Sequence, residues 1–206
     1  MKINEVKITR ETIERNVEEF IENDYSNSIL EKMESIDEIK DVTFDSCVFN
    51  NINFNSINLD SISMVDVIFN NCDLSNKSFD KEMLTRIVFN NCKLVGTSFI
   101  DSSLKDVVFK NCNCKYTNFS TSNLQRVSIE ESDLSESSFI EPEIVGIEFN
   151  DTNLSECEFV HSKLKDVDIS TCNISGTIFD TYSLKGIIVD SFQCANLVGL
   201  LGVRVK

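Results

Sequence analysis

The residues with the most reactive side chains in this chain are one histidine and eight cysteines. His161 is the only histidine, and an isolated imidazole is more typical of a solvated side chain than of a catalytic base. Cys112 and Cys114 form a Cys-x-Cys pair, but no histidine is placed near them to complete a zinc site. None of the glycines forms a phosphate-binding loop. The sequence therefore indicates a non-enzymatic protein without a cofactor or a metal site.

Acidic residues are the other candidates for function. The chain has 206 residues and a net charge of −15, and residues 127–162 contain no Lys or Arg. The ten acidic residues of this stretch, called the acidic belt below, are Glu130, Glu131, Asp133, Glu136, Glu141, Glu143, Glu148, Asp151, Glu156 and Glu158. A charge run is usually a solvated face, yet ten like charges repel one another at a cost that a structural role does not require. Either the belt serves solubility or it binds a partner, and its sign argues against direct nucleic-acid binding.

A period of five residues organises the chain around these side chains. Every fifth residue from Phe44 to Val189 is apolar, thirty positions in all, without a break. Neither a helix nor a strand has this period, so it predicts a solenoid. Positions twenty apart also resemble one another: Phe79, Phe99, Phe119, Phe139, Phe159 and Phe179 form one column, and Phe49, Phe69, Phe89, Phe109 and Phe149 form most of another. Four pentads per coil explain this segregation, which a three-sided coil would scramble.

Thirty pentads correspond to about 7.5 coils, each about 4.8 Å high, over residues 42–191. The interior of such a rod is filled by side chains. Six cysteines stand two residues before a central position, where a small buried residue is needed, so we expect free packing thiols rather than disulfides. Lys77 and Glu82 break the inward pattern, and either pair with each other or mark a bulge between Ser75 and Lys81, the bulge being favoured slightly.

Residues 1–41 lie outside the repeat and are expected to form a helical extension or cap. Ile13, Val17, Phe20 and Ile21 share one face at helical spacing, and Ser28 with Glu31 is a possible capping box for a second short helix that holds Leu30 and Met33. The first helix is expected to cover the outward apolar column of Val48, Ile68, Val88 and Val108.

Residues 192–206 are expected to form a cap with a short helix and an extended end, which closes the last coil or also dimerises. Its apolar residues are Phe192, Leu197, Leu200, Leu201, Val203 and Val205. The chain has no apolar run long enough to span a bilayer and no signal-peptide pattern, so a cytoplasmic protein without membrane contact is expected.

The pentads resemble those of the pentapeptide-repeat family, in which a small residue, Asp or Asn, and Leu or Phe precede two variable residues. Four stretches resemble its Qnr group more closely. The tail from Phe192 to Val205 looks like the Leu-Gly-Ile/Leu-x-Val ending of that group, and Phe79–Leu94 is similar to one of its coils. Ser103–Phe109 and Ser183–Ile187 look like the loopless chromosomal members of Gram-positive bacteria.

This resemblance implies an all-β, right-handed quadrilateral β-helix that dimerises through its C-terminus. It also implies a rod that imitates duplex DNA, binds DNA gyrase or topoisomerase IV and protects the enzyme from quinolones. The unbroken period leaves no room for the two loops that Gram-negative Qnr proteins use on gyrase, so contacts made by those loops cannot be carried over. The alternative is a rigid scaffold for a different protein partner.

Overall fold

The structure is a computed structural model that describes residues 1–8, 13–17, 24–33 and 36–203, with the backbone alone at 13–17, Lys32 and Leu201. The first strands are β1 (Ile13–Val17), β2 (Asp24–Ser26), β3 (Ser28–Met33), β4 (Glu38–Lys40), β5 (Thr43–Asp45), β6 (Val48–Asn50) and β7 (Asn58–Asp60). The middle of the rod holds β8 (Ser63–Asn70), β9 (Met83–Asn90), β10 (Ser103–Lys110), β11 (Asn123–Glu130) and β13 (Glu143–Asn150). Shorter strands are β12 (Ser138–Ile140), β14 (Glu158–Val160) and β15 (Ile178–Phe179). Helix α1 (Ser191–Val198) and a 3-10 turn (Gly199–Leu201) follow.

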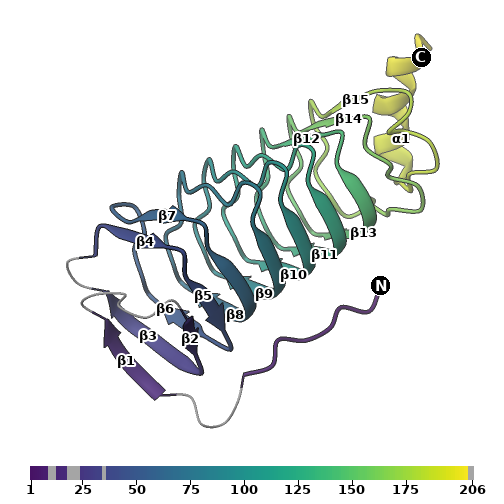
Figure 1. Cartoon of the computed structure of the whole chain (residues 1–206). Helices are drawn as coiled ribbons and strands as arrows, with labels where there is room; N and C mark the ends of the chain where they lie inside the picture. Colours follow the sequence, from purple (N-terminus) through teal and green to yellow (C-terminus); the bar gives the residue numbers. More distant parts are fainter. Residues whose placement is uncertain (9–12, 18–23, 34–35, 204–206) are drawn as a thin grey trace.

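All strand pairs are parallel, and their register confirms the four-sided solenoid. Leu84 pairs with Leu104 and Leu104 with Leu124, a step of twenty residues at each coil. Isolated bridges such as Ser78 to Ser98 continue the same step on the other sides. The chain thus winds into about eight turns, which Figure 1 shows as a row of stacked coils. No helix within the described residues is long and apolar enough to cross a membrane.

The two predicted phenylalanine columns fill the interior. The rings of Phe99 and Phe119 stack at a centroid distance of 5.0 Å with planes 5° apart. The two columns meet edge to face, as between Phe99 and Phe109 at 6.0 Å and 81°. Flat stacking within a column and edge contacts between columns are both favourable for aromatic rings. The interior is therefore a packed core without a channel.

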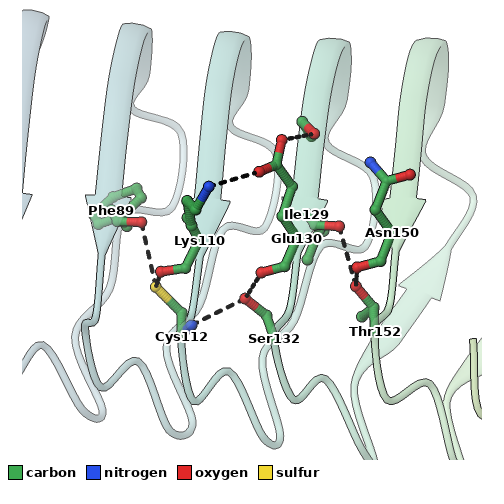
Figure 2. A network of polar contacts seen from close by, with 9 residues as sticks. Phe89, Lys110, Cys112, Ile129, Glu130, Ser132, Asn150 and Thr152 are labelled. Atoms are coloured by element: carbon green, nitrogen blue, oxygen red, sulfur yellow. Dashed lines mark hydrogen bonds and ion pairs between the residues drawn. The ribbon is translucent and has the colours of Figure 1, made fainter.

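Small inward side chains join successive coils by a second set of hydrogen bonds. Thr97 Oγ1 donates to the Leu74 carbonyl at 3.0 Å, and Thr152 Oγ1 donates to the Ile129 carbonyl at the same distance. Cys112 Sγ contacts the Phe89 carbonyl at 3.3 Å in the same way (Figure 2). The repeat therefore accepts Cys, Ser or Thr at this position because each has a short donor that reaches a buried carbonyl.

Lys77 and Glu82 occupy this inward position without a bulge, so the expectation of a bulge or of a mutual pair is wrong. Lys77 Nζ donates to the carbonyls of Asn55 and Ile57 at 3.1 and 2.8 Å. Glu82 Oε1 accepts from the Ile62 N–H at 3.3 Å. Both side chains bond the backbone of the preceding coil, as Thr97 does. Burial lowers the pKa of Lys77 and raises the pKa of Glu82.

The N-terminus differs from the expected helices. Ile13–Val17 is strand β1 and Ser28–Met33 is strand β3, and these two strands pair with each other. Strands β2, β3 and β4 then pair with β5, β6 and β7, so coil pairing begins upstream of residue 42. The pairs Tyr25–Phe44 and Leu30–Phe49 are nineteen residues apart instead of twenty. Because of this shift by one residue, the strict period of five in the sequence does not include the first coil. Phe20 and Ile21 lie outside the described residues.

Within the described part of the N-terminus, no helix covers the column of Val48, Ile68, Val88 and Val108, whose side chains are half-buried. Residues 1–8 instead run as an extended segment beside the strands that carry three of them (Figure 1).

Helix α1 caps the C-terminal end of the core, as expected. The Asp190 side chain accepts a hydrogen bond from the Gln193 N–H at 2.7 Å, and Gln193 Oε1 accepts one from the Asp190 N–H at 2.9 Å. The buried Gln193 amide group also donates to the carbonyls of Ile169 and Cys172, both at 2.8 Å. Leu197 packs against the core. One side chain therefore both starts the helix and fixes it to the last coil.

Candidate protein-binding surface

Five residues of the acidic belt stand at corners of the coils, where the backbone turns with positive φ. They are Glu131, Glu136, Glu141, Asp151 and Glu156, with φ between 48° and 61°. Asn and Asp tolerate this left-handed conformation, whereas glutamate pays about 1 kcal/mol. The same corner holds Asn in the four preceding coils, namely Asn51, Asn71, Asn91 and Asn111. Where the acidic belt begins, Glu131 replaces the asparagine that suits this backbone conformation better. The stability of the fold alone therefore does not explain the glutamate.

All ten belt residues lie at the surface, exposed or half-buried. Lys110 Nζ lies 3.5 Å from Glu130 Oε2, and Lys115 Nζ lies 3.4 Å from Asp133 Oδ2. The Met1 amino group pairs with Glu148. The other seven belt acids have no ion pair within the described residues. Three of the ten belt acids are thus neutralised, and most of the negative charge of the belt is not.

Two polar contacts fix single members of the belt. Burial alone would raise the pKa of Asp133, but hydrogen bonds from Ser135 and the charge of Lys115 outweigh it and lower that pKa. A hydrogen bond to Glu136 raises the pKa of the exposed Tyr116. These contacts hold charge at the surface and place no group for proton transfer.

The fourth corner of the rod is different in charge. Arg86 binds Asp66 through two hydrogen bonds of 2.7 and 2.6 Å, and Arg126 binds Asp106 through two of 2.6 and 2.7 Å. The bond from Arg126 holds the pKa of Asp106 well below its usual range, although burial opposes it. In the coil of the acidic belt this corner is Gly146. The belt therefore has acids at three corners, and the fourth corner is a column of neutralised pairs.

The expected dimerisation residues have different environments. Phe192 is 83% exposed, and Leu200 and Val203 are each 52% exposed. Leu197 is partly buried against the protein's own core. Leu201 is described by its backbone alone, and Val205 lies outside the described residues. Three exposed apolar side chains at the end of the rod are thus free for a partner, and Leu197 already has an intramolecular role.

The cysteines and the histidine show no arrangement for chemistry. The eight cysteines form no disulfide within the described residues and seven of them are buried, as the packing argument predicts. Burial raises the pKa of Cys157 to about 12, which keeps it protonated. His161 is 61% exposed in its side chain and lies 3.3 Å from Asp180. No group of three or more metal-ligating side chains occurs in the described part of the chain.

Sequence reasoning missed the contacts of residues 1–8 with the fourth corner. Lys7 and Asn4 donate backbone hydrogen bonds to Asp66 and Asp106. A signal for that corner was present, because Asp66, Arg86, Asp106 and Arg126 alternate in sign at steps of twenty. Nothing in residues 1–8 themselves marks an extended segment.

The comparisons with known proteins agree with the fold. Residues 62–139 match the family model described as the pentapeptide repeat region. A trypsin-treated variant of QnrB1, a plasmid-mediated fluoroquinolone resistance protein, is 22% identical, with 90% of this chain and 94% of that chain covered and a TM-score of 0.52. Full-length QnrB1 is 21% identical, with 87% and 90% covered and a TM-score of 0.48. HetL, which is involved in heterocyst differentiation regulation in the cyanobacterium Nostoc, is 16% identical, with 82% and 87% covered and a TM-score of 0.29.

A search of curated proteins finds no match to the chain. The repeat match covers the middle of the rod, and the structural likeness to QnrB1 extends the same coil geometry over most of the chain. Sequence period, coil register and these comparisons show that the chain has the pentapeptide-repeat fold, with a repeat region at residues 62–139 that matches the family model.

Proposed function

We propose that this chain is a non-enzymatic, cytoplasmic protein that binds DNA gyrase or topoisomerase IV through the acidic belt, in the place of duplex DNA. The observation that carries the proposal is Glu131 at a left-handed corner of the belt, where the preceding coils have asparagine. A glutamate at such a corner lowers the stability of the fold and adds an unpaired negative charge. A binding partner that recognises this charge best explains why the glutamate is there.

The charge density of the belt supports this role. The seven belt acids without an ion pair lie within residues 127–162, which is about 1.8 coils or roughly 9 Å of rod. Duplex DNA has one negative charge per about 1.7 Å, hence about five phosphates in that length. The belt therefore presents at least the line charge that a DNA-binding cleft recognises. A cleft that gains its affinity from phosphate contacts would bind such a rod with similar salt dependence.

The proposal includes a homodimer through the C-terminus. Phe192, Leu200 and Val203 expose apolar side chains at one end of the rod. Because exposed apolar surface of this kind is typical of interfaces, an isologous contact at this end is the simplest way to cover it. The dimer would place two acidic belts on either side of its centre and double the length of rod available to the enzyme.

Protection of the topoisomerase from quinolones is the biological outcome that we propose. The name of QnrB1 describes a fluoroquinolone resistance protein, and this chain shares its coil geometry. A protein that competes with DNA for the enzyme reduces the population of the enzyme–DNA complex to which such drugs bind.

Charge reversal at the belt corners tests the proposal. The triple variant Glu131→Lys, Glu136→Lys, Glu156→Lys should lose at least tenfold in affinity for gyrase or topoisomerase IV. The matched control is Asp41→Lys, Asp101→Lys, Asp166→Lys, which makes the same charge change at exposed corners with φ of 53°, 56° and 65° outside the belt. Equal loss in both variants would show that only net charge matters.

The second candidate is a scaffold for another protein, and the fold itself favours it because solenoids commonly present extended binding surfaces. It predicts that neither triple variant changes topoisomerase binding. Phe192→Asp separates the contribution of the dimer: a folded monomer in sedimentation with much weaker topoisomerase binding supports the dimer. A monomer that binds equally well removes the dimer from the mechanism.

A further inference from the structure

Residues 1–8 lie as an extended segment along the fourth corner of the rod (Figure 1). The Lys7 N–H donates to Asp66 Oδ1 at 2.9 Å. The Asn4 N–H donates to Asp106 Oδ1 and the Asn4 side-chain amide donates to Asp106 Oδ2, both at 3.0 Å. The corner thus recognises chiefly the backbone of this segment, together with one amide side chain.

The spacing of these contacts matches the geometry of an extended chain. Lys7 and Asn4 are three residues apart, and three residues of extended chain span about 10 Å. Asp66 and Asp106 are two coils apart, and two coils also rise about 10 Å. The segment can therefore follow the rod axis and meet one carboxylate at every second coil without strain.

The corner is prepared for this contact by its arginines. Arg86 and Arg126 each hold one aspartate with two hydrogen bonds, so that both carboxylates keep fixed positions. Asp106 has only 2% of its side chain exposed and accepts two hydrogen bonds from Arg126 and two from Asn4. A carboxylate held this way has lone pairs that point away from its arginine and suit an approaching N–H.

Gly146 continues the column and leaves space for the segment. A Cβ at this residue would lie 2.6 Å from Met1 Sδ, so any larger residue would displace that side chain. The corner residues Asp66, Arg86, Asp106 and Arg126 have positive φ, whereas Gly146 does not. At the coil where Met1 lies, this corner therefore differs from the corners of the earlier coils both in backbone conformation and in the size of its side chain. Next to it is a hollow lined in part by Val145, Lys163 and Lys165.

The segment is attached by few contacts. The side chains of Lys2, Asn4, Glu5 and Lys7 are exposed, and Ile3, Val6 and Ile8 are only half-buried. A segment held by a few hydrogen bonds and little apolar burial opens at low free-energy cost. A competing peptide can therefore reach the surface of the rod that residues 1–8 cover.

We propose that this corner, from Asp66 to Gly146, is a binding site for an extended peptide. Residues 1–8 occupy it within the chain, and an extended segment of a second protein can take it over. The segment it accepts has backbone N–H donors three residues apart and an Asn side chain at the donor that meets Asp106. This proposal does not rest on the topoisomerase proposal, although the site reaches the acidic belt where the Met1 amino group pairs with Glu148.

The test uses the full chain with its segment released. Asn4→Pro with Lys7→Pro removes both backbone donors and the Asn4 side chain, and leaves the corner intact. The probe is a synthetic peptide of residues 1–8 with a fluorophore at its C-terminus. We expect the released variant to bind the probe at least tenfold more tightly than the unaltered chain, because the tethered segment competes in the latter.

Two controls make the outcome decisive. Glu5→Pro changes the backbone at a residue whose N–H donates to no group in the described chain, and it should leave probe binding as weak as in the unaltered protein. A probe with proline at both donor positions should not bind the released variant. Equal binding of the probe to the released and unaltered chains, or no binding to a released variant that melts cooperatively, overturns the proposal.

Discussion

At the residue scale, inward positions of this solenoid must satisfy both packing and hydrogen bonding. The central positions hold stacked rings and branched chains that are fully buried, such as Phe99 and Leu104. The inward position two residues earlier needs a short donor, as Thr97 shows. Period and residue type in the sequence predict both sets. The behaviour of Lys77 and Glu82 could not be predicted, because it depends on which carbonyls and N–H groups of the neighbouring coil lie within reach.

Removal of one stacked ring should be costly. Phe99→Ala leaves a cavity between Phe79 and Phe119 in a rigid column, and we expect a loss of about 3 to 5 kcal/mol in the free energy of unfolding. Met83→Ala is the control, since that side chain is 64% exposed, and the unfolding free energy of this variant should change by less than about 0.5 kcal/mol. Urea denaturation measures both. Similar losses in the two variants would contradict the assignment of the core.

Glu82 should make the stability depend on pH in a definite direction. Burial raises the pKa of Glu82 above its ordinary value of 4.5, so the folded protein holds this proton more tightly than the unfolded chain. This group therefore adds stability as pH falls through the folded pKa towards 4.5. Glu82→Gln removes that contribution, so the variant should be relatively more stable at pH 7.5 than at pH 4.5 when compared with the parent. A constant difference between these pH values would exclude burial as the cause.

At the element scale, the repeat determines the coils but not the ends. The coils from β8 to β11 follow the period of five closely, and the sequence predicts their register. At the N-terminus, Ile13 and Val17 have helical spacing, yet β1 is a strand because pairing with β3 extends the solenoid. The offset of one residue at Tyr25 and Leu30 could have revealed the first coil. The unpaired edge of the neighbouring coil therefore determines the structure of this segment more strongly than the helical spacing of its apolar residues does.

The attachment of helix α1 should depend on one amide. Gln193→Glu replaces a donor to two buried carbonyls with a carboxylate that repels them, and we expect a loss of about 2 to 3 kcal/mol together with faster amide exchange in α1. Asn196→Asp makes the same chemical change at an exposed position of this helix and serves as the control. A stable Gln193→Glu variant with an ordered helix would show that Leu197 packing alone holds the cap.

At the scale of the whole molecule, the chain is a stiff rod with a net charge of −15 and an acidic belt in which seven of the ten acids have no ion pair within the described residues. The sequence predicts the belt and its position along the rod. It does not predict that the fourth corner is neutralised by ion pairs and covered by residues 1–8, because those contacts join segments about sixty and one hundred residues apart. The two surfaces can therefore act separately, one by charge and one by backbone recognition.

Competition with DNA tests the central claim most directly. Gyrase from the protein's own host is bound to the immobilised chain while linear duplex DNA is added at several salt concentrations. The account predicts that DNA displaces gyrase from the chain and that the affinity falls steadily with the logarithm of salt concentration, as for DNA itself. Gyrase that does not bind, or that stays bound at saturating DNA, would contradict mimicry of duplex DNA by the acidic belt.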